Sequence, residues 1–273
     1  MKLTKRFAAL GAVMLAVCLM FTSCSGQVED TGVAYEKNMK IASVEDLEGK
    51  IVAVQLRSEA DSYVKDHDLT NYIKRYEDMS DAAQDLAEKK VAALVVDSNY
   101  AKKLVADNDS LTIVKGAIAE IDYQFAVLKN ENSKKLVSQL NKQITAIHVT
   151  ERFNALIKAE LQGGEAAPAV KEEGKELKKN LTLLADPYFK PFIYKNDKAF
   201  DGFFVTVADE IAYAYGAELT VKEIDPDSEW SALETEENAI AVVTGEVDIE
   251  KYDVTDTFYT SELVIVVRKD ESK

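Results

Sequence analysis

Residues 46–56 read DLEGKIVAVQL, and residues 89–97 read KKVAALVVD. Each stretch contains an uninterrupted apolar run, Ile51–Val54 in the first and Val91–Val96 in the second, which predicts a strand buried on both faces. Between them, residues 80–87 place apolar side chains at helical spacing. Short apolar strands that alternate with helices predict an α/β fold with a mainly parallel sheet.

The same alternation continues along the chain. Strands are expected at 111–114 and 123–128, and apolar residues recur every three or four positions over 136–161, which is typical of helices. A second α/β unit is predicted after that. Its expected elements are strands at 181–184, 219–221, 240–243 and 263–267, a helix at 204–215 that Gly216 stops, and a short helix at 230–233.

The N-terminus has the pattern of an export signal. Three basic residues within the first six precede the apolar run Phe7–Phe21, which is too short to span a membrane. The residues that lead up to Cys24 resemble a bacterial lipobox, which implies a lipoprotein signal peptide over 1–23 and lipidation of Cys24, for instance with palmitate. We therefore expect a membrane-anchored protein on the extracytoplasmic face of the cell membrane. The alternative is an ordinary secretory signal cut nearby, with Cys24 incidental.

Charge and cysteine content limit the possible functions. Removal of the signal peptide takes the net charge from −15 to −18, which argues against nucleic acid as a partner because its phosphates require a positive surface. Of the two cysteines, Cys18 lies inside the signal, and Cys24 would carry lipid. The exported chain would then have neither a disulfide nor a thiol for catalysis or metal binding.

Two blocks of the chain together resemble one known family. The first block runs over 46–56 and 82–97. The second block lies within 181–269, and its matching residues are Asp186, Pro191–Tyr194, Gly202, Phe203, Phe258–Ser261 and Val266–Asp270. The combination resembles the extracellular solute-binding proteins of polar amino-acid ABC transporters, in their family 3-like form. The resemblance implies an α/β, two-lobed type II periplasmic-binding-protein-like fold.

The lobes occur in the opposite order to the family's. Residues 42–120 are similar to its second lobe and residues 181–273 to its first lobe. Residues 121–164 are expected to form a hinge crossing and helices that pack on the first lobe, and residues 165–180 a linker that joins the family's usual termini. This order is typical of a circular permutation, which protein folds tolerate at exposed sites; the alternative is two gene fragments joined by chance. We expect the new ends to interrupt one inter-lobe crossing, which leaves a single covalent crossing near Ile121–Phe125. Ahead of the second lobe, residues 24–41 are a lipid-anchored tether.

The resemblance also implies which residues bind a ligand between the lobes. Asp186 matches the family's first-strand carboxylate, and Phe189 matches its stacking aromatic residue. Thr244 matches a hydroxyl that meets the ligand, and Asp97 matches the second-lobe carboxylate that takes the ligand's amino group. Ser58 matches a hydroxyl at a helix N-terminus, where backbone N–H groups favour an anion.

One expected ligand contact is missing. In the family an arginine a few residues beyond the hydroxyl position grips the α-carboxylate of the amino acid. Residues 245–254 are shorter than the family pattern and contain no arginine. The replacement cation is either Arg57, which stands where the family often has glycine, or Lys251. Arg57 could equally be a solvated residue at the edge of the cleft.

The resulting functional hypothesis is a lipid-anchored extracellular solute-binding protein that captures a small polar solute, an amino acid or a related compound, for an ABC transporter. The expected partners are the solute, the permease subunits and the membrane, and the protein is expected to be a monomer without cofactor, metal or nucleic acid. The alternative is a surface sensor or interaction protein that keeps the fold but has lost amino-acid binding. An enzyme is disfavoured, because neither a Ser-His-Asp set nor a metal-binding motif stands out, and His67 and His148 are isolated.

Overall fold

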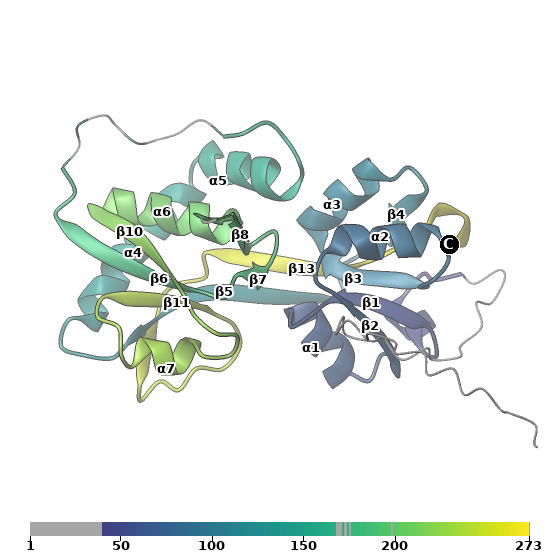
Figure 1. The fold of residues 1–273 in the computed structure, drawn as a ribbon, viewed down its shortest axis with the longest axis horizontal. Helices are drawn as coiled ribbons and strands as arrows, with labels where there is room; N and C mark the ends of the chain where they lie inside the picture. Colours follow the sequence, from purple (N-terminus) through teal and green to yellow (C-terminus); the bar gives the residue numbers. More distant parts are fainter. Residues whose placement is uncertain (1–39, 168–170, 172–173, 175, 198, 273) are drawn as a thin grey trace, which may run out of the picture. The chain divides into compact units, whose positions relative to one another are not determined.

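Two long strands, β5 (Ala119–Leu128) and β13 (Tyr259–Arg268), lie side by side and take part in both lobes of the fold (Figure 1). They are antiparallel, with Tyr123 opposite Tyr259 and Ala119 opposite Leu263. The computed structural model describes residues 40–167, 171, 174, 176–197 and 199–272. Within these residues, β5 and β13 join the strands of both lobes into one mixed sheet in the order β10-β6-β11-β5-β13-β3-β1-β2.

The second lobe is built from the first part of the described chain. Its elements are a 3-10 turn η1 (Val44–Leu47), β1 (Ile51–Gln55), α1 (Glu59–Asp66), β2 (Tyr72–Tyr76), α2 (Met79–Ala87), β3 (Ala93–Asp97), α3 (Ser98–Asp107) and β4 (Leu111–Ile113). Strand β1 is parallel to β2 and β3, as the sequence predicts. The far half of β13 runs antiparallel to β3 and β4, so this lobe has a mixed sheet.

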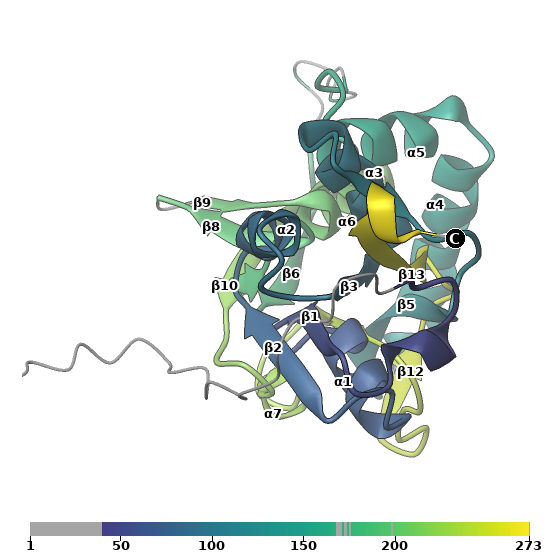
Figure 2. The same cartoon turned by 90° about the vertical axis from the view of Figure 1, so that its right-hand side faces the viewer.

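Helices cover both faces of the second lobe's sheet (Figure 2). Val52, Val54 and Val95 face α1 and η1, whereas Ala53 and Leu94 face α2 and α3. Successive residues of a strand point to opposite faces, so the unbroken apolar runs at β1 and β3 supply both layers of core.

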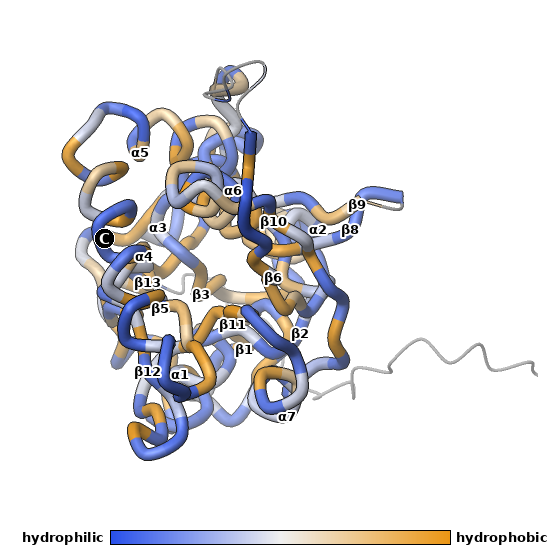
Figure 3. Tube along the Cα trace, turned by 90° about the vertical axis from the view of Figure 1, so that its left-hand side faces the viewer, coloured by the Kyte–Doolittle hydropathy of each residue, from blue (hydrophilic) through white to orange (hydrophobic). Residues whose placement is uncertain are grey.

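The first lobe repeats this layered arrangement. Its elements are β6 (Lys179–Ala185), β7 (Tyr188–Phe189), β8 (Ile193–Asn196), β9 (Ala199–Asp201), α6 (Phe203–Tyr215), β10 (Ala217–Glu223), α7 (Glu229–Leu233), β11 (Ala239–Val243) and β12 (Tyr252–Val254). Strands β10 and β11 flank β6 in parallel, and β5 adds antiparallel to β11 and β12. Figure 3 shows hydrophobic residues concentrated on β6, β11 and β5.

Aromatic side chains fill the core where β5, β13 and α6 meet. The rings of Phe125 and Phe258 stack with centroids 4.2 Å apart, and Phe204 packs edge-on against Phe258 at 5.1 Å. Gly202, just before α6, has φ +115°, and a Cβ there would lie 2.6 Å from the carbonyl oxygen of Phe192. Only glycine fits this start of the helix, because α6 packs directly on the loop before β8.

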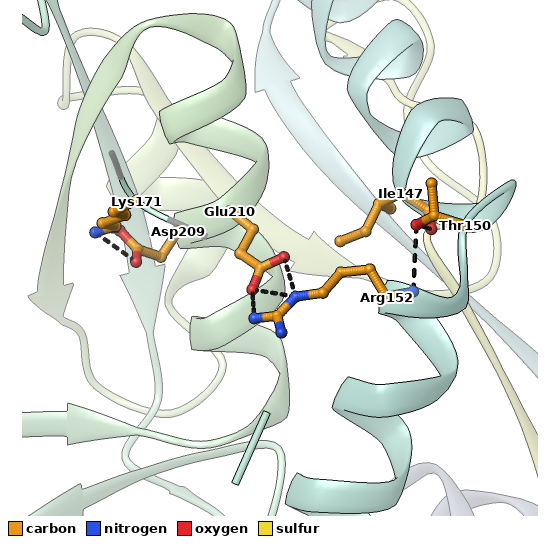
Figure 4. A network of polar contacts seen from close by, with 6 residues as sticks. All are labelled: Ile147, Thr150, Arg152, Lys171, Asp209 and Glu210. Carbon is orange, nitrogen blue, oxygen red and sulfur yellow. Dashed lines mark hydrogen bonds and ion pairs between the residues drawn. The ribbon is translucent and has the colours of Figure 1, made fainter. Parts of the chain in front are cut away.

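The helices α4 (Ser133–His148) and α5 (Glu151–Leu156), with the π-helical turn η2 (Ile157–Leu161), pack on the first lobe. Arg152 of α5 donates through Nε to both carboxylate oxygens of Glu210 on α6, at 2.9 and 3.0 Å (Figure 4). Beyond them, Lys171 binds Asp209 of the same helix at 2.8 Å. The described residues between η2 and β6 form neither helix nor strand.

The expectation of a single covalent crossing between the lobes is wrong. Strand β13 starts beside β5 and continues as an unbroken strand into the second lobe, where Leu263–Val266 pairs with β3. The last residues of the expected first-lobe segment 181–273 therefore belong to the sheet of the second lobe. Sequence periodicity locates a strand but does not show which lobe's strands it pairs with.

The two ends of the described chain meet at the outer end of the second lobe. The N–H of Ile41 donates to the carbonyl of Glu271 at 3.0 Å, and Ile41 forms a parallel bridge with Ser272. Arg268, 2% exposed, forms an ion pair with Glu271, 3% exposed. The crossing that was expected to be interrupted is thus continuous, and the residues at the two ends of the described chain pack together.

Some expectations fall outside the described residues: the signal peptide 1–23, Cys24 and nearly all of the tether. Where the structure does describe the chain, it contains no helix that is long and apolar enough to cross a membrane. The observed α/β architecture, with two lobes connected by two antiparallel strands, confirms the expected type II periplasmic-binding-protein-like fold class.

Candidate functional site

A cavity of about 300 Å³ is lined by residues of both lobes. Small-molecule sites generally start at about this size. The second lobe and β5 contribute Leu56, Arg57, Glu59 and Tyr123; the first lobe contributes Leu184, Asp186, Tyr188, Phe189, Ile193, Ile224, Asp227, Glu229, Trp230, Val242, Val243, Thr244 and Glu246.

The sheet topology explains why these residues converge. Asp186 and Thr244 directly follow the carboxyl ends of β6 and β11, and Arg57 lies two residues beyond the carboxyl end of β1. Ligand sites of open α/β sheets lie beyond the carboxyl ends of their parallel strands. The structure thus brings four of the predicted site residues, these three and Phe189, to one cavity.

Hydrogen bonds connect the lobes around this cavity. The Thr244 hydroxyl donates to Glu59 Oε1 at 2.5 Å, and Gln55 Nε2 donates to the carbonyl of Lys190 at 2.6 Å. Lys190 also forms an ion pair with Asp78 at 3.0 Å. Two residues of the first-lobe loops, Thr244 and Lys190, are therefore in contact with the second lobe, and the predicted ligand contact Thr244 already has a protein partner.

Arg57 is the one cationic residue that lines the cavity within the described part of the chain. Its φ of 60° lies in the left-handed region, which fits the glycine that the family often has there. Its guanidinium lies over the ring of Tyr188, with Cζ 5.4 Å from the ring centroid. Lys251, the other candidate, does not line the cavity and contacts Glu234 at 3.5 Å.

Phe189 forms part of an aromatic wall. Its ring centroid lies 4.9 Å from that of Phe192 and 6.3 Å from that of Tyr123. Phe189 is half-buried, so part of its surface is left to face the cavity. Tyr188 also lines the cavity, whereas Tyr259 is buried in the core.

Asp97 and Ser58 lie outside the cavity lining. Asp97 is 4% exposed and accepts four hydrogen bonds, from the N–H groups of Asn99 and Tyr100 and the hydroxyls of Tyr259 and Ser261. Burial raises the pKa of the Asp97 carboxyl. The four hydrogen bonds favour the ionised form and lower the pKa, but the effect of burial is larger. Ser58 donates to the carbonyl of Gln55 and caps α1 through the N–H of Asp61. The side-chain oxygens of Asp97 and Ser58 therefore already form hydrogen bonds with other groups of the protein.

Several lining residues were missed by the sequence reasoning. Asp227, Glu229, Glu246 and Trp230 were not singled out as lining residues. Trp230 does pack on Tyr252, with centroids 4.6 Å apart, but it also faces the cavity. The dense acidic residues between β10 and β11 are a signal for Asp227 and Glu229 alone, and no local pattern indicates that Glu246 joins them.

Metal binding and imidazole chemistry depend on how potential metal ligands and histidines are placed. The described residues include no group of three or more His, Cys, Asp or Glu side chains placed to hold a metal ion. His148 Nε2 is 2.8 Å from the carbonyl oxygen of Phe258, and its ring packs on Phe153. The cavity lining contains charged, hydroxyl and aromatic side chains, which can bind a ligand by ionic, hydrogen-bond and ring contacts.

Comparison with known proteins gives partial similarities. No family model matches the chain. The L-cystine-binding protein TcyA of Bacillus subtilis (strain 168) is 32% identical over 96 residues, which are 34% of this chain. The match covers 36% of that relative's length, about a third of it.

Solved structures with a similar chain path are more distant in sequence. A phosphate-binding protein of a Streptococcus pneumoniae TIGR4 phosphate ABC transporter is 10% identical, with a TM-score of 0.47 over 82% of this chain and 92% of that chain. A probable amino-acid ABC transporter extracellular-binding protein of Bacillus subtilis, ytmK, is 11% identical, with a TM-score of 0.42 over 81% and 84%. The fold class therefore rests on the strand topology of the chain itself.

We predict that Asp97→Ala destabilises the protein by about 2–4 kcal/mol without any ligand, because the buried hydroxyls of Tyr259 and Ser261 lose their acceptor and α3 loses its N-cap. Urea unfolding measures the effect. The control Ser98→Ala, one residue further on, should change stability by less than about 0.5 kcal/mol. A variant Asp97→Ala that is as stable as the parent but loses ligand would instead assign Asp97 to binding.

Proposed function

We propose that this protein is an extracytoplasmic solute-binding protein that captures a small polar solute, an amino acid or a related compound, between its lobes and delivers it to ABC permease subunits. The observation that carries the proposal is the cavity whose wall combines strand ends of both lobes. A ligand there contacts both lobes at once, so its binding free energy favours their closed arrangement. The partial match to a cystine-binding protein supports the same role.

The chain's single tryptophan gives a direct test. Trp230 lines the cavity, so a bound solute should change its fluorescence. In a panel of amino acids and small polar solutes, the true ligand at 100 times its Kd should add about 2.7 kcal/mol of stability, or about 5–10 °C in Tm. The proposal is abandoned if nothing in a broad panel at millimolar concentration changes either signal.

Matched variants connect the signal to the cavity. Phe189→Ala removes part of the aromatic wall and should weaken binding about tenfold. Phe200→Ala, on β9 and outside the cavity lining, should leave affinity unchanged. Equal losses in both variants would place the ligand elsewhere.

A second candidate is a surface sensor or interaction protein on the same fold. The Thr244–Glu59 hydrogen bond and the position of Arg57 over Tyr188 favour it, because the protein's own side chains use groups that would otherwise meet a solute. A cavity that stays unresponsive to the solute panel supports this second function.

The lipid anchor on Cys24 belongs to the proposal. It would hold the acidic binding domain at the extracytoplasmic face of the cell membrane, near a permease. We expect the exported protein to begin at Cys24 and to carry lipid on that residue, as read by mass spectrometry of its N-terminal peptide. A first residue other than Cys24, or an unmodified Cys24, would contradict the anchor.

The permuted order is the remaining part of the proposal. Strand β13 runs into the second lobe. Just beyond its end, the N–H of Ile41 donates to the carbonyl of Glu271 at 3.0 Å, and Ile41 is where the described part of the second lobe begins. The family's chain would continue from one to the other at this point, and residues 165–180 would join its usual ends.

A reordered gene tests the permutation. Joining Ser272 to Ile41 through a few residues and opening the chain within 165–178 should give a protein with the same cooperative unfolding and the same ligand. Opening it instead between Tyr123 and Gln124, in the middle of β5, should prevent folding. A reordered chain that cannot fold would refute the permutation.

A further inference from the structure

The charge of the cavity wall is strongly one-sided. Five carboxylates line the cavity, against one guanidinium, that of Arg57. The carboxylates are those of Glu59, Asp186, Asp227, Glu229 and Glu246. They come from two lobes and four separate loops or helix starts, so no local run of acidic sequence accounts for their convergence.

These carboxylates have no cationic partner within the described residues. Glu59 accepts a hydrogen bond from the Thr244 hydroxyl, and Asp186 accepts one from the N–H of Tyr188. Both donors are neutral, and Asp227, Glu229 and Glu246 make no side-chain hydrogen bond or ion pair with any residue that the structure describes. Like charges that share a cavity repel each other, so the wall gains most from a ligand that carries positive charge.

Aromatic rings complete a wall suited to cations. Tyr123, Tyr188, Phe189 and Trp230 all line the cavity. The face of an aromatic ring attracts a cation within about 6 Å of its centroid. The Arg57 guanidinium already lies 5.4 Å from the centroid of Tyr188, so one of these rings holds a cation of the protein itself.

We propose that the cavity takes a small organic cation with one or two amino or guanidino groups, and that it disfavours the α-carboxylate of an ordinary amino acid. This inference rests on the proposed solute-binding function and names its ligand class. About 300 Å³ has room for roughly ten water-sized groups, which matches a short diamine or an alkylguanidine.

Arg57 then acts as a competitor rather than as a ligand contact. It adds positive charge to a cavity that attracts cations, and it occupies the face of Tyr188. An α-carboxylate that bound this exposed side chain would be repelled by the five carboxylates of the same cavity. The other candidate for that role, Lys251, lies outside the lining and contacts Glu234.

Matched probes separate the two ligand classes. 1,5-Diaminopentane is L-lysine without its carboxylate, and agmatine is L-arginine without its carboxylate. In calorimetric titrations of the full exported chain at low and at physiological salt, each decarboxylated probe should bind at least about tenfold more tightly than its amino acid. The affinity should fall as salt rises.

Variants locate the charge effect. Asp186→Asn and Glu229→Gln should each weaken 1,5-diaminopentane binding roughly tenfold. Arg57→Ala should strengthen it by roughly two- to fivefold, because a like charge leaves the cavity. The control Asp225→Asn removes an exposed carboxylate from the same β10–α7 loop, outside the lining, and should change the affinity less than about twofold.

Two results overturn the ligand class while leaving the solute-binding function intact. One is L-lysine or L-arginine binding as tightly as its decarboxylated probe and losing affinity in Arg57→Ala, which would make Arg57 the carboxylate contact. The other is a neutral or anionic solute that stabilises the protein while neither diamine nor agmatine does. If no solute of any charge binds, the solute-binding function itself fails, and the ligand class fails with it.

Discussion

The antiparallel pairing of β5 with β13 is the constraint on which the rest of the structure depends. Each strand is ten residues long, and each contributes one half to each lobe. Because both strands belong to one mixed sheet that spans the two lobes, neither can move in one lobe without disturbing its hydrogen bonds in the other. The pair therefore fixes the edge at which the loops of both lobes meet, and Tyr123 of β5 lies there as part of the cavity wall.

The same constraint explains why the cavity uses some predicted residues and not others. Arg57, Asp186 and Thr244 follow parallel strands at the edge where the lobes meet, so backbone topology alone brings them together. Asp97 is the last residue of β3, next to β13, and its carboxylate accepts hydrogen bonds from the hydroxyls of Tyr259 and Ser261 on that strand. A carboxylate that secures the inter-lobe strand cannot also meet a ligand without leaving two buried hydroxyls unpaired.

The sequence predicts the buried parts of this protein well and its edges poorly. The apolar runs at β1, β3, β6 and β11 predict strands because they are buried on both faces. Strand β2 (Tyr72–Tyr76) was missed because its residues are half-exposed, and the small sheet β7-β8-β9 because its strands are short and polar. The helix α2 begins at Met79, one residue before the stretch 80–87 that the sequence indicates, and Asp78 is its N-cap. The second crossing and the acidic wall depend on pairing between distant segments, which local patterns do not contain.

Charge at the cavity also affects how the lobes approach each other. Glu59 lies on the second lobe, whereas Asp186, Asp227, Glu229 and Glu246 lie on the first, so closer approach of the lobes brings like charges together. Contacts between the lobes that oppose this repulsion include the hydrogen bonds of Thr244 and Gln55 and that of Gln162 with Asn99. Arg57 also lies over Tyr188, and the Lys190–Asp78 ion pair has side chains that are 48% and 35% exposed and therefore screened by solvent. If the ligand is a cation, its charge removes the repulsion at the moment of binding. Recognition of the ligand and closure of the lobes would then be driven by the same electrostatic interaction, and a ligand without positive charge would have to close the lobes against it.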